Sequence, residues 1–227
     1  MKDDIVSYRE MCDRERIQTL QRGMNWRLGG SYSVILMSQR SNAPYKDAIL
    51  EDGVTIIYEG HDVPRTAEIV DPKRVDQPLT TKTGRPTQNG LFVRAVEAKR
   101  DGAPAETVRI YEKLFSGIWS YKGEFSLENY TQVNDGSRNV FRFELRLVES
   151  TSMSHSTTLR QRSRIIPAEV KQEVWIRDGG KCAICGATDE LHFDHDIPYS
   201  KGGSSITADN VRILCARHNL AKSDKIE

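Results

Sequence analysis

The clearest hydrophobic pattern in this chain is a strict alternation over residues 140–148, where apolar and charged side chains take turns. A period of two predicts a half-buried β-strand. Short apolar segments bounded by Gly, Asp and Pro predict six more strands, over residues 31–37, 54–59, 90–96, 108–114, 117–123 and 130–133. Seven such strands indicate a curved sheet or barrel, and a charged, helix-like stretch up to about residue 22 precedes them.

A different pattern begins after residues 149–158, which are rich in Ser and Thr and have no periodicity. Residues 167–178 have the spacing of an amphipathic helix, with a proline at the first turn and two glycines after the end. Further on, residues 191–198 alternate like a strand, and residues 216–225 predict a last helix. The change in pattern marks a domain boundary.

The length of 227 residues suits two small domains. We expect an α+β protein with an N-terminal domain at residues 1–150, a linker at 151–164 and a C-terminal domain at 165–227. The net charge is only +1, from 33 basic and 32 acidic residues, so a nucleic-acid partner would have to bind local basic patches. No apolar run approaches the length of a membrane span, and we expect no membrane partner.

Two pairs of metal-ligand residues lie in the C-terminal domain. Cys182 and Cys185 form a Cys-x-x-Cys pair, and Cys215 and His218 form a Cys-x-x-His pair. Thiolates and imidazole at this spacing predict a structural Zn²⁺ site with four protein ligands. A disulfide framework is the alternative, but the charged N-terminus has no apolar signal segment and the fourth cysteine, Cys12, stands alone, which is typical of a reducing compartment.

Polar residues of a catalytic type accompany these pairs. Asp194-His195 and Asn210 lie between them, and Asn219 follows the second pair. Phosphodiester cleavage needs a base that activates water and a cation near the leaving oxygen. A neutral imidazole takes up a proton near pH 7, and carboxylate and amide oxygens are ligands that Mg²⁺ prefers. The set therefore predicts a nuclease rather than a plain zinc finger.

Residues 165–227 resemble the HNH endonuclease family. The matching positions are both metal pairs together with Asp194-His195, Pro198, Gly202-Gly203, Asn210, Asn219 and Lys222. The resemblance implies a zinc-stapled ββα-metal fold in which His195 is the general base and Asp194 and Asn219 ligate a catalytic Mg²⁺ or Mn²⁺. It also implies that Asn210 braces the loop that orients His195.

Residues 30–148 resemble the SRA (YDG) domain, a family that reads 5-methylcytosine by flipping it out of the duplex. The matching words are Tyr32-Ser-Val-Ile-Leu, Tyr45-Lys-Asp47, Tyr58-Glu-Gly60, Asp76-Gln77-x-Leu79-Thr80, Asn89-Gly-Leu-Phe and Val108-Arg-Ile-Tyr. The resemblance implies an SRA/PUA-like curved β-barrel with flanking helices. Tyr45 and Tyr58 would stack on the flipped base, and Asp47 would accept a hydrogen bond from its exocyclic amine. A polar loop with Lys82 and Arg85 would bind the DNA.

Together these features predict a modification-dependent restriction endonuclease, which recognises 5-methylcytosine or 5-hydroxymethylcytosine by base flipping and hydrolyses nearby phosphodiester bonds. Its partner would be double-stranded DNA carrying modified cytosine, in the cytoplasm of a prokaryote. One HNH site cuts one strand, so a double-strand break calls for a homodimer or transient pairing on DNA. Two alternatives stay open: a sequence-specific HNH nuclease acting on unmodified DNA, and a modified-base reader whose HNH unit is not catalytic.

Overall fold

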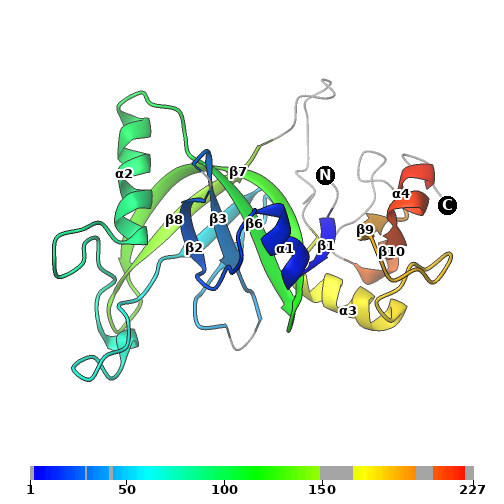
Figure 1. Cartoon of the computed structure of the whole chain (residues 1–227), viewed down its shortest axis with the longest axis horizontal. Coiled ribbons are helices and arrows are strands. Elements are labelled where there is room, and N and C mark those ends of the chain that lie inside the picture. The colour runs from blue at the N-terminus through cyan, green and yellow to red at the C-terminus, as the bar shows by residue number, and fades with distance from the viewer. Residues whose placement is uncertain (1–2, 29, 41–42, 149–165, 198–206, 223–227) are drawn as a thin grey trace.

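The structure is a computed structural model that describes the chain except for residues 1–2, 29, 41–42, 149–165, 198–206 and 223–227. The expected linker at residues 151–164 and the motif positions 198, 202 and 203 therefore lie outside the described residues. Within the described part, four α-helices accompany a ten-stranded sheet (Figure 1). The predicted α+β class is confirmed. No described helix has the length and apolar character needed to cross a membrane.

Along the chain, groups of strands are separated by helices. In order they are β1 (Asp3–Ser7), α1 (Tyr8–Arg14), β2 (Met24–Leu28), β3 (Tyr32–Met37), β4 (Ala48–Ile49), β5 (Thr55–Glu59), η1 (Pro72–Arg74), α2 (Gln88–Arg100), β6 (Thr107–Phe115), β7 (Ile118–Asn134), β8 (Asn139–Leu147), α3 (Ala168–Asp178), β9 (Leu191–His195), η3 (Ala208–Asn210), β10 (Val211–Cys215) and α4 (Ala216–Lys222).

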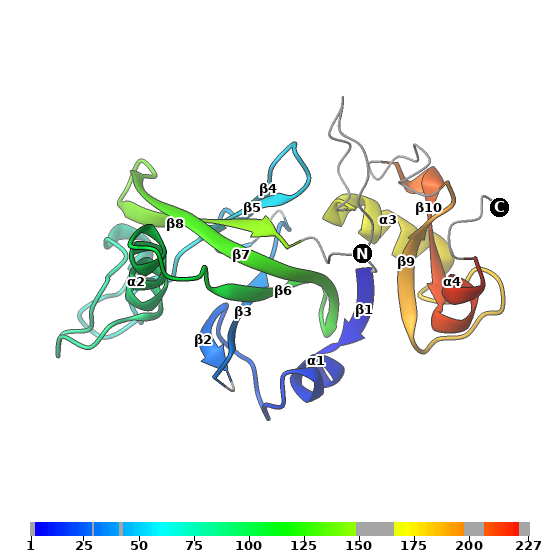
Figure 2. The ribbon, with the colours of Figure 1, turned by 90° about the horizontal axis from the view of Figure 1, so that it is seen from above.

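The sheet is curved and mostly antiparallel, as Figure 2 shows from above. Its main path runs in the order β10-β9-β1-β7-β6-β3-β2, with one parallel pair between β3 and β6. A branch continues from β7 through β8 and β5 to β4. β7 thus pairs with three strands and connects both parts of the sheet.

The prediction of a strand at residues 90–96 is wrong, because these residues belong to α2. The hydroxyl of Thr87 accepts a hydrogen bond from the amide of Gly90 at 3.2 Å and so caps the helix. Phe92, Val93 and Val96 are buried on one side of the helix. A short apolar run fits a buried strand and a buried helix equally well, which explains the error.

Three other boundaries also differ from the sequence prediction. The strands expected at residues 117–123 and 130–133 are one strand, β7, whose pairing with β8 shifts register between Leu127 and Asn129. The polar residues in between concealed its continuity. The helix-like start is divided into β1 and α1, and β2 was not predicted. β1 consists of Asp-Asp-Ile-Val-Ser, so its sequence carries no apolar run.

Three hydrophobic clusters hold these elements together. The largest fills the curved sheet beneath α2 and includes Phe92, Phe125 and Phe143. A second lies under α1 and includes Met11 and Tyr111. The third packs α3, β9 and β10 against the end of β6. This third cluster contains residues of both predicted domains.

Candidate active site and base pocket

The four predicted metal ligands come together in the C-terminal part of the chain. Each of Cys182, Cys185, Cys215 and His218 offers a ligand atom within 4.8 Å of the others. The Sγ atoms of Cys185 and Cys215 are 3.8 Å apart, and Nδ1 of His218 lies 3.4 Å and 3.3 Å from the Sγ atoms of Cys182 and Cys215. Two Zn–S bonds of about 2.3 Å at a tetrahedral angle place their sulfurs ~3.8 Å apart, so the cluster fits one tetrahedral ion.

The local backbone explains this geometry. The amide of Gly186 donates to the carbonyl of Cys182 at 2.8 Å, and Gly186 has a φ of +74°, which closes the first knuckle. Burial raises the pKa of the Cys182 thiol, but backbone hydrogen bonds around the knuckle and the His218 ring outweigh this effect and lower the pKa to about 6. A thiolate is the form that binds metal.

The expected nuclease residues lie on a ββα unit next to this cluster. β9 and β10 pair in antiparallel register, with His195 opposite Val211, and α4 follows β10 directly. Lys222 of α4 is 1% exposed, and its Nζ donates to Oδ2 of Asp194 at 2.5 Å and to the carbonyl of His195. Lys222 therefore ties α4 to the strand that carries both predicted catalytic residues.

Asn210 forms hydrogen bonds to the segment that follows His195. Its Oδ1 accepts a hydrogen bond from the amide of Ile197 at 2.8 Å, and its Nδ2 donates to the carbonyl of Ile197 at 3.2 Å. Its own carbonyl accepts from the amide of Asp196 at 2.9 Å. Three hydrogen bonds thus join η3 to the turn after β9.

The residues expected to hold the catalytic cation lie on facing elements. Asp194 is on β9 and the buried Asn219 is on α4, which pack against each other. A carboxylate and an amide oxygen are hard donors of the kind Mg²⁺ binds. The ammonium group of Lys222 already lies against Asp194, so this carboxylate faces a positive charge in the structure. A divalent cation at this place would have to share the Asp194 carboxylate with Lys222.

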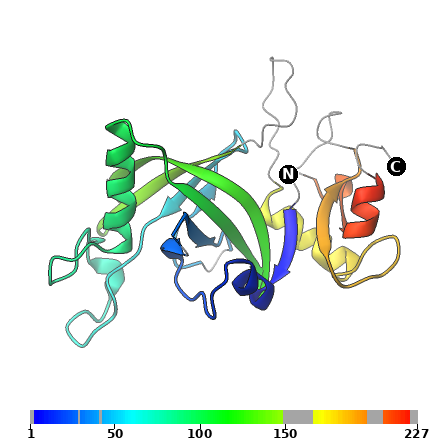
Figure 3. The same ribbon diagram turned by 45° about the horizontal axis from the view of Figure 1, so that its top comes forward.

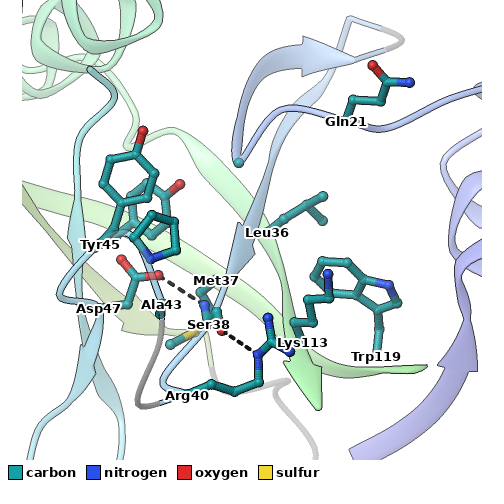
Figure 4. Close-up of a pocket in the computed structure, with 13 residues that line it drawn as sticks. Gln21, Leu36, Met37, Ser38, Arg40, Ala43, Tyr45, Asp47, Lys113 and Trp119 are labelled. Carbon is teal, nitrogen blue, oxygen red and sulfur yellow. Dashed lines mark hydrogen bonds between the residues drawn. The ribbon is translucent and has the colours of Figure 1, made fainter. Parts of the chain in front are cut away.

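The three predicted base-binding residues line one cavity of about 260 Å³. Figure 4 shows Tyr45 and Asp47 on one side of the space and Lys113 and Trp119 on the other. The full lining is Gln21, Gly23, Leu36, Met37, Ser38, Arg40, Ala43, Pro44, Tyr45, Asp47, Tyr58, Lys113 and Trp119. The sequence analysis missed Arg40, which follows β3, and Lys113 and Trp119, which reach the cavity because the β6–β7 hairpin pairs with β3.

Asp47 is anchored by backbone amides at the edge of the cavity. Its Oδ2 accepts from the amide of Ser38 at 3.0 Å (Figure 4). Its Oδ1 accepts from the amide of Glu59 at 3.1 Å. Burial raises the pKa of Asp47 to about 7, and the nearby charges of Glu59 and Glu112 act in the same direction. The carboxyl group is therefore held in place by two backbone amides, and its raised pKa favours protonation near neutral pH.

The two tyrosines are held by a histidine that the sequence analysis did not select. The Tyr58 hydroxyl lies 3.3 Å from Nε2 of His61, and the rings of Tyr45 and His61 are stacked at 5.8 Å. Burial lowers the pKa of His61 to about 4, so the ring is neutral at pH 7. Nζ of Lys73 lies 4.0 Å from the centroid of the Tyr45 ring. These contacts orient Tyr45 from outside the cavity.

Lys82 and Arg85 lie on an exposed turn, away from the cavity lining. Backbone hydrogen bonds between Thr81 and Arg85 and between Gly84 and Thr81 close the turn. The Nζ atom of Lys82 forms an ion pair of 2.9 Å with Glu68, and both side chains are exposed. The structure therefore does not bring these two residues together with the base-binding candidates.

Comparison with known proteins identifies the C-terminal unit. Residues 182–225 match the model of the HNH endonuclease family, so we refer to this part of the chain as the HNH domain. A search of curated proteins found no match.

Three solved structures are similar to all or part of this chain. The SUVH5 SRA complex with hemimethylated CG DNA is 21% identical, with a TM-score of 0.43, and the alignment covers 66% of this chain and 93% of that one. The modification-dependent TagI restriction endonuclease is 16% identical, with a TM-score of 0.43 and coverage of 99% and 77%. SUVH6 of Arabidopsis thaliana is 22% identical, with a TM-score of 0.43 and coverage of 75% and 28%.

Loss of one metal ligand should destabilise the protein. Structural zinc contributes roughly 10 kcal/mol or more in isolated finger peptides. At about 2–4 °C per kcal/mol for a chain of this size, losing even part of this energy in Cys182→Ser should lower Tm by ~10 °C or more. Metal content by atomic spectroscopy should fall with it. Cys12→Ser, outside the cluster, should retain the metal, and an unchanged Tm in Cys182→Ser would contradict a structural role.

The raised pKa of Asp47 predicts a pH dependence of stability. Between pH 3.8 and about pH 7, Asp47 keeps a proton in the folded protein that it has lost in the unfolded chain. The contribution of Asp47 to the free energy of unfolding should therefore fall as the pH rises through this range. Asp47→Asn should flatten this decline in urea unfolding curves measured from pH 4 to pH 8. Identical slopes for the two proteins would show that Asp47 is not protonated in the fold.

Proposed function

We propose that this protein is a modification-dependent DNA endonuclease, which binds a flipped 5-methylcytosine or 5-hydroxymethylcytosine in the Tyr45–Asp47–Tyr58 cavity and cuts nearby with its HNH domain. The observation that carries the proposal is the combination, in one chain, of an HNH domain with a cavity that offers aromatic rings and an anchored carboxyl group. Each part alone allows other functions.

The cavity has the chemistry that a flipped cytosine requires. A volume of about 260 Å³ is several times the ~30 Å³ that one water occupies in the liquid, so a small ring fits. Tyrosine rings offer faces for stacking, and an oxygen of Asp47 can accept from the exocyclic amine. When Asp47 is protonated, it can also donate to the ring nitrogen beside that amine. Cytosine is the pyrimidine that presents this donor and acceptor side by side.

The HNH domain supplies the hydrolytic groups. His195 would take the proton from the attacking water, since a neutral imidazole is an effective base near pH 7. Asp194 and Asn219 would hold Mg²⁺ or Mn²⁺, which stabilises negative charge on the departing oxygen when bound. Asn210 restrains the turn after His195, and Lys222 holds its strand against α4. Zn²⁺ at Cys182, Cys185, Cys215 and His218 would be structural.

The proposed partner is double-stranded DNA carrying modified cytosine. Arg40 and Lys113 line the cavity and would contact the phosphates that flank a flipped base, whereas Lys82 and Arg85 would add contacts farther away. A homodimer or transient pairing on DNA would allow both strands to be cut. Such an enzyme would act on incoming modified DNA in a prokaryotic cytoplasm.

Replacing the proposed base should stop the chemistry and leave binding intact. His195→Ala should lower the single-turnover cleavage rate on modified duplex by about 100-fold or more, because general-base catalysis is lost. Its affinity for the duplex and its zinc content should match those of the wild type. A rate near that of the wild type would exclude His195 as the base.

Replacing the carboxyl group of the cavity should weaken recognition of the modified base. Asp47→Ala should reduce the preference for modified over unmodified duplex by roughly 1–3 kcal/mol, or about 5–150-fold in relative affinity. Salt-dependent, non-specific binding should persist. The matched control is Glu51→Ala, which removes the same charge from an exposed position outside the cavity.

Competition binding and cleavage with duplexes that differ only in the methyl group provide the measurement. If the wild type bound and cut both duplexes equally, the modified-base proposal would be rejected in favour of a nuclease for unmodified DNA. Selective binding without any cleavage would instead favour a reader with an inactive HNH unit.

A further inference from the structure

One strand joins the two parts of the chain. β1 pairs with β7 of the N-terminal part, where Val6 lies opposite Trp119, and with β9 of the HNH domain, where Asp4 lies opposite His192. Figures 2 and 3 show β1 between the curved sheet and the C-terminal unit. Backbone pairing therefore runs without interruption from the cavity wall to the strand of His195.

Side chains reinforce this junction. Oδ1 of Asp4 lies 2.9 Å from Nδ1 of His192, and Oδ2 of Asp4 lies 2.9 Å from Nη1 of Arg14. Asp4 thus contacts β9 and α1 at the same time. The His192 contact is three residues from the proposed base, His195, on the same strand.

Below the sheet, α3 of the C-terminal part inserts a buried lysine into the N-terminal part. Nζ of Lys171 donates to the hydroxyl of Ser120 at 2.8 Å and lies 4.0 Å from Glu112. Glu112 also forms an ion pair of 2.6 Å with Lys122, whose ammonium group donates to the carbonyl of Ile166. The charged side chains of Glu112, Lys122 and Lys171 are fully buried. Separating the two parts would therefore leave charged groups without their partners.

A shared hydrophobic core completes the contact. Leu114 of β6 is fully buried in the cluster formed by Val174 of α3, Phe193 of β9 and Ile213 of β10, and Ile118 of β7 packs against it. The cavity residues Lys113 and Trp119 are the immediate neighbours of Leu114 and Ile118 in the chain. Phe193 stands directly before Asp194-His195.

We propose that the junction of β1 with β7 and β9, locked by Lys171 and the shared core, holds the base cavity and the HNH site as one rigid unit and thereby sets the number of base pairs between the modified base and the cut. The proposal rests on the proposed function. DNA has a persistence length of about 150 base pairs, so a duplex spanning the two sites is stiff. A fixed separation in the protein then becomes a fixed separation along the DNA.

Mapping the cuts at single-nucleotide resolution tests this role. The substrate is a duplex with one central 5-methylcytosine, compared with its unmethylated twin. For the wild type we expect cuts confined to a narrow window at a constant distance from the methylated base. Inserting a Gly-Ser-Gly-Ser segment within residues 151–158 should leave this distance unchanged, because the junction and not the tether determines it.

A variant of β1 should have the opposite effect. Ile5 pairs with Ser120 and packs against the shared core, and Ile5→Pro removes a backbone donor from the middle of the strand. This variant should keep selective binding and its zinc but spread the cuts over several base pairs. The control Ile5→Val keeps the backbone donor and should cut within the same narrow window as the wild type. Calorimetry of the wild type should show one unfolding transition, since the two parts share a core.

The outcomes separate this inference from the proposed function. Equal cutting of the methylated and unmethylated duplexes would refute the proposed function. Methyl-dependent cutting at scattered positions, a distance that shifts with the inserted segment, or two separate unfolding transitions would each refute the role of the junction alone. If Ile5→Pro does not fold, the inserted segment and the calorimetry still decide the question.

Discussion

The backbone pairing of β7 is the constraint on which the rest of this structure depends. Within its 17 residues, β7 pairs with β6, β8 and β1. Its pairing with β6 creates the wall that places Lys113 and Trp119 at the cavity, and its pairing with β1 leads to the HNH domain. A register slip by one residue would turn every side chain of β7 to the other face. Both sites would then lose their geometry.

Buried charge is the second feature that both sites share. Asp47 at the cavity, Lys222 at the HNH strand and Lys171 at the junction are all ionisable groups with little access to water. Burying a charge is costly unless it has partners, and each of these groups has specific partners. These contacts fix the carboxyl group of Asp47 at the edge of the cavity and hold Lys222 against the strand of His195.

The errors of the sequence prediction have a common physical cause. The apolar run at residues 90–96 has no periodicity that distinguishes a helix from a strand. These residues form part of α2, where they are buried against the curved sheet. β1 has a weak strand sequence and owes its conformation to neighbours on both sides. Where the local signal is weak, tertiary contacts determine the conformation. The domain boundary predicted at the Ser/Thr-rich stretch did not reveal that β1 pairs with strands on both sides of it.

The sequence by itself determined the metal cluster, the HNH residues, the α+β class and three residues of the cavity. Paired metal ligands with two residues between them, and motifs such as Tyr-Lys-Asp, lie within a single turn or loop, so their spacing already restricts their geometry. The tertiary structure alone decided that Arg40, Lys113 and Trp119 complete the cavity, that His61 orients its tyrosines and that the two parts share one sheet and one core. Lys113 and Trp119 lie far from the other cavity residues in the chain, and only the folded sheet brings them together.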